Sequence, residues 1–577
     1  MNFPQACWCM LLGIFVAPVA AQFTLQGPGV DPNDFQVTTF ASGLNFPVGM
    51  AELDDGSILT AVSNGNSFWA NDGGSLIRLA DTDNDGVADQ QTTLVSDVPF
   101  GGLTTVRVAG DLVFTTGQGN GKPIQIYRMG ATPTDPFTSV GSVTLLYPNG
   151  GWLHPHSALT VRQVEDSAPG VAGYEVYFQL GSKTNFDDTT DLLRLRSTIG
   201  VSSNIEGDAI HRITLTDDGS TVNATGITQI ATGLRNAAGM DFHPRTGDLY
   251  LQDNGIDGLV NANEPHSADE LNVIPSGDVG NSVADFGFPE TYTEYRTGTV
   301  VGNTGIQPLA AYQPVGPDEL EGEGPNDIAF APPQFPASIR NGVFVGMHGK
   351  FSEGGISNEE NPLIYTDISD GSYFHFIGND ESEIGHPDGL LSTQDSLFLA
   401  DISPDGSFGS SSSNEGKIYR IRSLVRPGDF DDDGSYTCAD VDSLVAKIAA
   451  GTNEAEFDVT GDGVVDRIDL EAWRVEAGYA QLASQEAYLP GDANLDGFVD
   501  ASDFNLWNAN KFTATASWCS GDFTVDGFVD ASDFNIWNSH KFTASDVVAV
   551  PEPQPAFLFL VAFALVVRRT DLRKFRG

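Results

Sequence analysis

Four acidic loops of twelve residues constrain the last third of this chain more tightly than any other feature. Each loop has an oxygen-bearing side chain at positions 1, 3, 5 and 12 and a glycine at position 6. Calcium takes about six to eight oxygen ligands, the alternating side chains point inward to supply them, and glycine permits the sharp turn. The spacing therefore predicts four calcium sites, each followed by a helix. The predicted ligands are Asp429, Asp431, Asp433, Asp440, Asp458, Thr460, Asp462, Asp469, Asp492, Asn494, Asp496, Asp503, Asp522, Thr524, Asp526 and Asp533.

The loops come in two pairs, which begin at residues 429 and 458 and at residues 492 and 522. Position 12 is aspartate, where an EF-hand has a bidentate glutamate. This aspartate and the pairing resemble the type I dockerin module, which implies small α-helical calcium-loop domains at residues 425–482 and 483–545. The third and fourth loops continue into near copies, GFVDASDFNLWN and GFVDASDFNIWN, which indicate an internal duplication.

Two hypotheses remain open for these modules. Calcium serves only to hold a small domain together, or the modules also bind a cohesin-like protein. In both cases, three or four carboxylates in one loop repel one another without the ion, so we expect folding to require calcium.

Charge excludes one class of partner. The chain has 28 basic and 78 acidic residues, a formal net charge of −50. Such a charge repels phosphate backbones, so we expect no nucleic-acid binding, and divalent cations are the natural partners.

The first residues predict export. An apolar run over residues 8–19 followed by Ala20 and Ala21 is typical of a secretory signal that is cleaved near Ala21, which makes residues 1–21 the signal peptide. The mature chain then retains Cys438 and Cys519, and their spacing leaves open whether they form a disulfide.

The last residues, 546–577, combine a Pro-Glu-Pro sequence, an apolar segment over residues 556–567 and a basic cluster. This order resembles the PEP-CTERM sorting tails of bacteria, which implies processing and extracellular or cell-surface display. The alternative is a plain membrane anchor with a short transmembrane segment. In either case we expect the body of the protein outside the cytoplasm, in contact with a membrane only through this tail.

Residues 22–424 consist of short alternating stretches rich in glycine, valine, threonine and phenylalanine, which favour an all-β fold. Six times, a glycine or asparagine, an apolar pair and a turn lead into an apolar strand. Repeated four-strand units of this kind predict a six-bladed β-propeller, and a pair of β-sandwiches is the alternative. The six stretches begin at Pro47, Gly102, His156, Asn236, Asn326 and Pro387.

Four segments of this body carry a more specific signal. They are GLRNAAGM at residues 233–240, DELN at 269–272, FGFP at 286–289 and FVGMHG at 344–349. These segments resemble the glucose/sorbosone dehydrogenase family, which includes soluble quinoprotein sugar dehydrogenases. The resemblance implies a propeller that holds pyrroloquinoline quinone and calcium at its axial mouth and oxidises a sugar at C1.

The resemblance also implies roles for single residues. His154 falls where the family keeps its general base, which takes a hydroxyl proton as hydride passes to the quinone. Arg235 and Asn236 match the quinone-contacting pair, and the backbone of Gly255 and Ile256 matches the calcium contacts.

Two departures from the family weaken this assignment. In the family, an aspartate that follows a glycine holds the active-site histidine. The corresponding dipeptide here is Gly181-Ser182, so this chain has serine in place of that aspartate. Where the family has arginines for the anionic cofactor, this chain has Asp388, which would repel it. Lys350 is the residue that could compensate.

A further acidic loop lies inside the propeller region, with Asp81, Asp83 and Asp85 at the calcium spacing but no acid at position 12. It predicts a surface calcium site between strands, or else a turn without metal.

Three functions are compatible with these patterns. The first is an exported sugar or aldehyde oxidoreductase on a propeller, attached through calcium modules to the cell surface or to a polysaccharide-degrading assembly. The second is a non-catalytic propeller that binds a surface polymer or a protein. The third is a dockerin-bearing glycoside hydrolase, for which no pair of carboxylates stands out.

Overall fold

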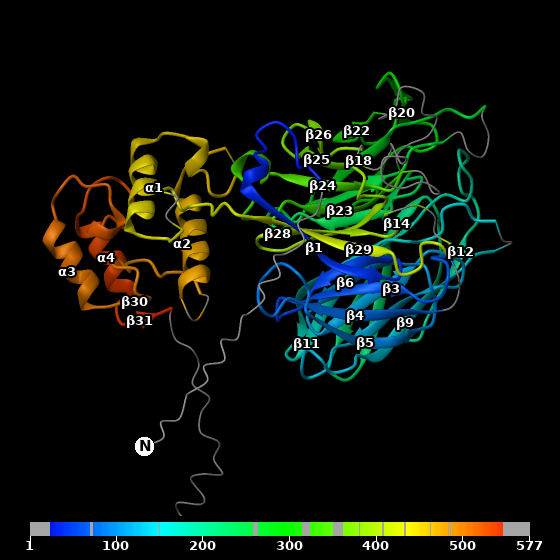
Figure 1. The fold of residues 1–577 in the computed structure, drawn as a ribbon, viewed down its shortest axis with the longest axis horizontal. Coiled ribbons are helices and arrows are strands. Elements are labelled where there is room, and N and C mark those ends of the chain that lie inside the picture. Colours follow the sequence, from blue (N-terminus) through cyan, green and yellow to red (C-terminus); the bar gives the residue numbers. More distant parts are fainter. Residues whose placement is uncertain are drawn as a thin grey trace, which may run out of the picture. The chain divides into compact units, whose positions relative to one another are not determined.

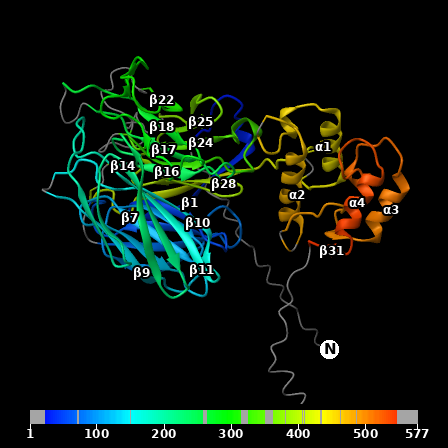
Figure 2. The same cartoon turned by 180° about the vertical axis from the view of Figure 1, so that it is seen from behind.

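The computed structural model describes residues 23–545 except 70–72, 149–150, 258–262, 314–323, 350–361, 380, 405, 407–408, 432–433, 462, 483 and 485. The chain divides into two compact units, one ending at Val425 and the other beginning at Arg426 (Figure 1, Figure 2). The first unit is built of strands and the second is mainly helical. The predicted signal peptide and sorting tail lie outside the described residues.

Six sheets make up the first unit, and one strand of each lies in a central ring in which neighbouring strands contact one another. The first unit is therefore a six-bladed β-propeller, as predicted, and the alternative of two sandwiches is wrong. The ring strands are β2 (Pro47–Glu52), β6 (Leu103–Ala109), β10 (Leu159–Ala168), β16 (Gly239–Phe242), β23 (Pro325–Phe330) and β27 (Pro387–Ser392). All six coincide with the recurring stretches of the sequence.

The remaining strands extend each blade outward from the ring. Blade one adds β3 (Ile58–Ser63), β4 (Gly74–Ala80) and β5 (Gln90–Val98), and blade two adds β7 (Leu112–Gly117), β8 (Pro123–Arg128), β9 (Thr138–Leu146), β12 (Leu193–Ser197) and β13 (Ser202–Ile205). Blade three adds β11 (Val171–Leu180), β14 (Ala209–Asp217), β15 (Val222–Thr232) and β19 (Ala284–Asp285), and blade four adds β17 (Leu249–Asp253), β18 (Asp269–Ile274) and β22 (Ala310–Tyr312). Blade five adds β24 (Gly342–Met347), β25 (Leu363–Asp367) and β26 (Tyr373–Ile377), and blade six adds β28 (Ser396–Asp401), β29 (Gly416–Ser423) and β1 (Phe35–Leu44). A short pair, β20 (Tyr292–Thr293) and β21 (Val300–Val301), forms a separate two-stranded ribbon.

Strand position explains the sequence pattern. The inner strands β2 and β3 are buried almost throughout because neighbouring blades cover both faces, so they are continuous apolar runs. The outer strand β5 is largely exposed and correspondingly polar. The ring closes through β1, which pairs antiparallel with β29 from Phe35 opposite Ser423 to Leu44 opposite Gly416. The two ends of the propeller chain thus share one blade.

The described part of the second unit contains four α-helices, each directly after one of the acidic loops. In every case the aspartate at loop position 12 is the third helical residue, and it exchanges hydrogen bonds with the N-cap residue in a capping box. The loop pattern therefore also fixes where each helix begins. The helices are α1 (Cys438–Ala450), α2 (Arg467–Gln481), α3 (Ala501–Asn510) and α4 (Ala531–His540), and β30 (Phe498–Val499) pairs with β31 (Thr543–Ala544).

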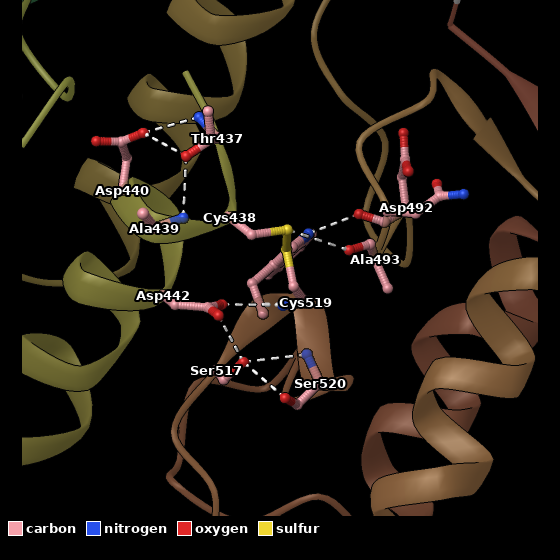
Figure 3. Close-up of a disulfide and its surroundings, with 12 residues drawn as sticks. Thr437, Cys438, Ala439, Asp440, Asp442, Asp492, Ala493, Ser517, Cys519 and Ser520 are labelled. Atoms are coloured by element: carbon pink, nitrogen blue, oxygen red, sulfur yellow. Dashed lines mark hydrogen bonds between the residues drawn. A yellow bond between two sulfur atoms is a disulfide. The ribbon is translucent and has the colours of Figure 1, made fainter. Parts of the chain in front are cut away.

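The two loop pairs share one core, which contains Val441 and Trp473 from the first pair and Trp518 and Trp537 from the second. A disulfide joins Cys438 at the start of α1 to Cys519, with their Cα atoms 5.9 Å apart (Figure 3). The bond that the sequence left open is thus present. Beside it, the Ser517 hydroxyl donates to Asp442 over 2.8 Å. The indole N–H of Trp518 donates to the Asp492 carbonyl over 2.7 Å, inside the third loop.

The duplicated third and fourth units are tied together reciprocally. Trp507 of α3 donates its indole N–H to the carbonyl of Asp530 over 2.8 Å, and Trp537 of α4 donates to the carbonyl of Asp500 over 2.9 Å. Asp500 and Asp530 are the N-caps of α3 and α4, so each helix anchors the start of the other.

Within the residues that the structure describes, no helix has the length and apolar character that a membrane crossing needs.

Candidate ligand-binding mouth and calcium loops

A cavity of about 310 Å³ opens at one end of the propeller axis. It lies where the ring strands begin, because Thr104, Asn326 and Asp388 at the starts of β6, β23 and β27 all line it. Four residues predicted from distant sequence segments meet here: His154, Arg235, Asn236 and Gly255. Lys350 lies outside the described residues.

His154 is held by its backbone in a neutral, partly buried position. Its backbone N–H donates to the Ser182 carbonyl over 3.0 Å. A Cβ on Gly181 would lie 2.8 Å from the Cβ of His154, so glycine is required at this contact. Burial and the charge of Arg235 lower the pKa of His154 well below its ordinary value. Its Nε2 is buried and has no hydrogen-bond partner among the described residues. The imidazole is therefore a neutral group with an unsatisfied ring nitrogen.

Arg235 is fully engaged by protein groups. Its guanidinium donates to Asn185 and to the Asn254 carbonyl, and pairs with Asp257 over 2.8 Å. Its side chain is only 3 % exposed. The arginine thus has little capacity left for an anionic ligand.

The neighbouring backbone is fixed by Asp253, whose carboxylate accepts the N–H groups of Arg235 and Asn236 over 2.9 and 2.5 Å. Burial raises the pKa of Asp253 to about 6. The segment that carries Arg235 and Asn236 is therefore anchored from beneath by a buried carboxyl group.

The predicted backbone contacts to calcium are partly used within the protein. Gly255 lines the cavity and donates its N–H to Asp269 over 2.8 Å. The Ile256 carbonyl accepts the N–H of Ser267 over 3.0 Å, and the Ile256 N–H donates to the Ser267 hydroxyl. A Cβ on Gly255 would lie 2.1 Å from the Ser267 carbonyl, which explains the glycine.

The opposite wall holds a second polar group. Asp388 Oδ1 accepts from Asn326 Nδ2 over 2.6 Å and contacts His348 Nδ1 at 2.5 Å. Asp388 Oδ2 is buried without a hydrogen-bond partner among the described residues. The sequence indicated that Asp388 departs from the family pattern, but it did not indicate that His348 would contact this carboxylate.

Aromatic residues on the rim were not predicted. Phe68 and Trp69 both line the cavity, with ring centroids 4.7 Å apart, and Trp69 is 45 % exposed. They follow β3 in a loop, and the unusual exposure of a tryptophan has no local sequence signal.

These residues do not fit pyrroloquinoline quinone, which carries three carboxylates. The described lining contains the carboxylates of Asp257, Asp269 and Asp388. Its one guanidinium among the described residues, that of Arg235, already forms an ion pair with Asp257. An anionic cofactor would therefore face like charges in a desolvated site.

The four helical-unit loops share one geometry. In each, the N–H of the position 6 glycine donates to the position 1 aspartate over 2.7–2.9 Å, and the position 9 N–H donates to the position 12 aspartate over 2.7 Å. The four glycines have φ between 82° and 85°, in the left-handed region. Asp433 and Asp462 lie outside the described residues.

Carboxylates lie close together in these loops. In the first loop, one oxygen each from Asp429, Asp431 and Asp440 lies within 4.8 Å of the others. In the third, burial and the charge of Asp503 raise the pKa of Asp492 to about 7, and in the fourth, burial and the charge of Asp533 raise that of Asp522 to about 6. An all-oxygen donor set with this charge fits calcium.

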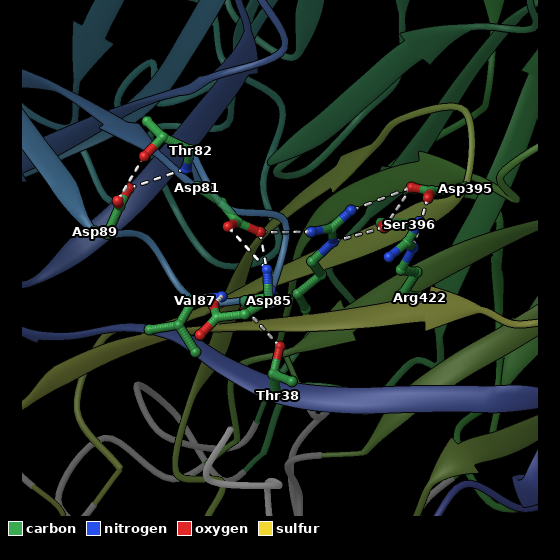
Figure 4. Close-up of polar contacts among 11 residues, drawn as sticks. Thr38, Asp81, Thr82, Asp85, Val87, Asp89, Asp395, Ser396 and Arg422 are labelled. Atoms are coloured by element: carbon green, nitrogen blue, oxygen red, sulfur yellow. Dashed lines mark hydrogen bonds and ion pairs between the residues drawn. The ribbon is translucent and has the colours of Figure 1, made fainter. Parts of the chain in front are cut away.

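The propeller loop between β4 and β5 brings together Asp81, Asp83 and Asp85, whose ligand atoms also lie within 4.8 Å of one another. Figure 4 shows Asp81 and Asp85 of this loop. Asp81 accepts the N–H groups of Asp85 and Gly86 and pairs with Arg420 of β29 over 3.3 Å. Because Arg420 partly neutralises this group, we expect it to bind calcium more weakly than the helical-unit loops.

No protein-family model matches the chain. A curated protein of unknown function from Borreliella burgdorferi is 27 % identical over 215 residues, which are 33 % of this chain. The match spans about half of that protein, 48 % of its length.

Several solved structures are similar. A calcium structure of a Trichoderma reesei carbohydrate-active enzyme of family AA12 is 16 % identical, with a TM-score of 0.42 over 70 % of this chain and 97 % of that one. The PQQ domain of pyranose dehydrogenase from Coprinopsis cinerea is 14 % identical, with a TM-score of 0.43 over 70 % and 98 %. An oxidoreductase described as a glucose dehydrogenase, from Thermus thermophilus, is 17 % identical, with a TM-score of 0.39 over 67 % and 99 %. The assignment of the propeller rests on the topology of its six sheets.

Proposed function

We propose that this is an exported, calcium-dependent protein whose propeller binds a carbohydrate at its axial mouth. The observation that carries the proposal is the lining of the mouth cavity. The exposed ring of Trp69 offers a stacking surface for the apolar face of a sugar. The polar side chains of Asn236, Asn326 and Asp388 in the lining suit hydrogen bonds with the hydroxyl groups of that sugar. A cavity of about 310 Å³ accommodates a mono- or disaccharide unit.

His154 is the candidate catalytic residue of this site. A neutral imidazole with a free ring nitrogen can accept the proton of a sugar hydroxyl, the proton-transfer half of a dehydrogenation at C1. Oxidation further requires an acceptor for the hydride, which the described lining does not identify. Sugar or aldehyde oxidation is thus the reaction class that suits His154. Carbohydrate binding alone requires no hydride acceptor, so it is the part of the proposal that the described lining supports by itself.

Replacing His154 with alanine tests its contact with the ligand. We expect affinity for the tightest ligand in a panel of neutral, amino and acidic monosaccharides to fall about five- to 150-fold, since losing one partner in a desolvated hydrogen bond costs about 1–3 kcal/mol. Titration calorimetry on the calcium-loaded chain measures this, with His540→Ala in α4 as the matched control. Because the pKa of His154 is lowered and glucose has no group that titrates in this range, wild-type affinity for glucose should stay flat between about pH 6 and 8. Equal affinity of the alanine variant and wild type would contradict the role.

A quinone-dependent dehydrogenase is the second candidate. The observation that favours it is the meeting of His154, Arg235, Asn236 and Gly255 in one cavity. The charge of the lining opposes it, so we expect no saturable binding of micromolar pyrroloquinoline quinone in an absorption titration with excess calcium. Saturable binding, followed by dye reduction that depends on added glucose, would establish the dehydrogenase instead.

The helical unit is proposed to bind four calcium ions and to link the exported propeller to the cell surface or to a cohesin-like protein. The donor sets of its loops support the first part. The predicted signal peptide and sorting tail support a location outside the cytoplasm. Peptide mapping of the exported protein would show whether residues 1–21 and the tail at residues 546–577 have been removed.

A further inference from the structure

Asp388 is an incompletely satisfied carboxylate in the wall of the mouth cavity. Its side chain is 1 % exposed, and its Oδ1 is held by Asn326 and His348. Its Oδ2 is buried and accepts no hydrogen bond from any described residue. A buried carboxylate oxygen without a donor is unfavourable, so a ligand that supplies a donor is bound more tightly.

The charge balance of the cavity indicates what kind of donor suits it. The described lining contains the carboxylates of Asp257, Asp269 and Asp388, the guanidinium of Arg235, and the imidazoles of His154 and of His348, which contacts Asp388. Arg235 is spent on Asp257, Asn185 and the Asn254 carbonyl, and none of these contacts involves β27. A cationic ligand group would therefore meet a site with an excess of negative charge, and an anionic group would be repelled.

A metal ion is a poorer match than an organic cation. Among the described residues, the groups of three acidic or histidine ligands whose atoms lie within 4.8 Å of one another are in the Asp81 loop and the first helical-unit loop. The carboxylates of the mouth form no such group among the described residues, and, unlike those of the other helical-unit loops, they are not spaced along one loop around a glycine turn. An ammonium group needs only one carboxylate with a free oxygen, and strong charge-assisted hydrogen bonds follow.

We propose that the mouth selects sugars that carry a protonated amine, and that Asp388 Oδ2 receives the ammonium group. This inference rests on the proposed carbohydrate function and specifies its ligand class. The sugar ring would stack on the Trp69 side while the amine reaches β27.

Calorimetric titration of the full calcium-loaded chain at pH 7 and about 0.15 M salt tests the proposal with four probes: glucosamine, glucose, N-acetylglucosamine and glucuronate. A sugar amine whose pKa is near that of an α-amino group, about 8, is mostly protonated at this pH. We expect glucosamine to bind about tenfold or more tighter than glucose, and N-acetylglucosamine and glucuronate to show no such gain. Near pH 9.5 the preference should disappear while the affinity for glucose stays unchanged.

The variant Asp388→Asn keeps an acceptor for Asn326 and His348 but removes the charge. It should bind glucosamine and glucose within about twofold of each other, whereas Asp218→Asn, the same change in an exposed turn, should keep the preference. A preference that survives in Asp388→Asn overturns the role of Asp388.

The comparison of probes uses the wild-type chain, so its outcome does not depend on how a variant folds. Equal affinity for glucosamine and glucose overturns this inference and leaves the carbohydrate function standing. Failure of all four probes to bind at millimolar concentration overturns the inference and counts against the proposed function itself.

Discussion

Chelation of calcium with EDTA at pH 8 is expected to abolish the helical structure of residues 426–545. The position 12 aspartates Asp440, Asp469, Asp503 and Asp533 are fully buried, each within a loop that contains further carboxylates. Without the ion, ionising these groups costs both desolvation and mutual repulsion. Circular dichroism at 222 nm during a thermal melt measures the loss. Re-added calcium should restore the signal, and equimolar magnesium should not, because magnesium demands a smaller octahedral shell.

The pH dependence of the metal-free form provides an independent check. The folded-state pKa of Asp492 is raised to about 7 and that of Asp522 to about 6, above the unfolded value of about 3.9. The folded state therefore binds more protons than the unfolded state between about pH 4 and 7, and the free energy of unfolding falls as pH rises through this window. In EDTA at 25 °C we therefore expect a stronger helical signal at 222 nm at pH 5 than at pH 8. With calcium the order should reverse, because protons compete for its ligands. Melts that are identical with and without chelator would remove the basis for the calcium assignment.

Replacing Cys438 and Cys519 with serine is expected to lower the free energy of unfolding of the helical unit by about 3–4 kcal/mol. The bond closes a segment with a sequence separation of 81 residues, so it removes much conformational entropy from the unfolded chain. Urea denaturation of the calcium-loaded protein measures the difference, and Ser443→Ala, an exposed site on α1, is the matched control. Reduction of the wild type should reproduce the effect. A loss below about 1 kcal/mol would mean that the shared core alone holds the loop pairs together.

The two effects should be separable. Calcium acts on each loop, whereas the disulfide joins the first loop pair to the second. With calcium bound, the serine variant should keep its helices at 25 °C while melting earlier, because the ligands in each loop are unchanged. The shared core around Trp473 and Trp518 keeps the two pairs in contact.

Local sequence patterns were sufficient for the inner strands of the propeller and for the helices of the second unit. The six recurring stretches coincide with β2, β6, β10, β16, β23 and β27 because an inner propeller strand is covered on both faces and must be apolar throughout. The acidic loops predicted the starts of α1 to α4 because the same aspartate serves as loop position 12 and as third residue of the capping box.

The mouth was predicted only in part. The resemblance to a dehydrogenase family led to His154, Arg235 and Asn236, and they do line one cavity. The hydrogen bonds of Arg235 to Asn185 and Asp257 join loops of different blades. The exposure of Trp69 depends on how the loop after β3 is placed at the mouth. Such contacts join residues far apart in sequence, so no local pattern reports them.

The sequence by itself determined the inner strands of the propeller, the points where the four helices begin and the acidic character of the chain, since each depends on residue type and short-range spacing. Only the tertiary structure decided that Cys438 meets Cys519, that four loop–helix units share one core, and that Asp388 lines the mouth with one oxygen that has no partner among the described residues. These three features depend on chain segments brought together by packing, whose geometry is set by the whole fold rather than by any one stretch.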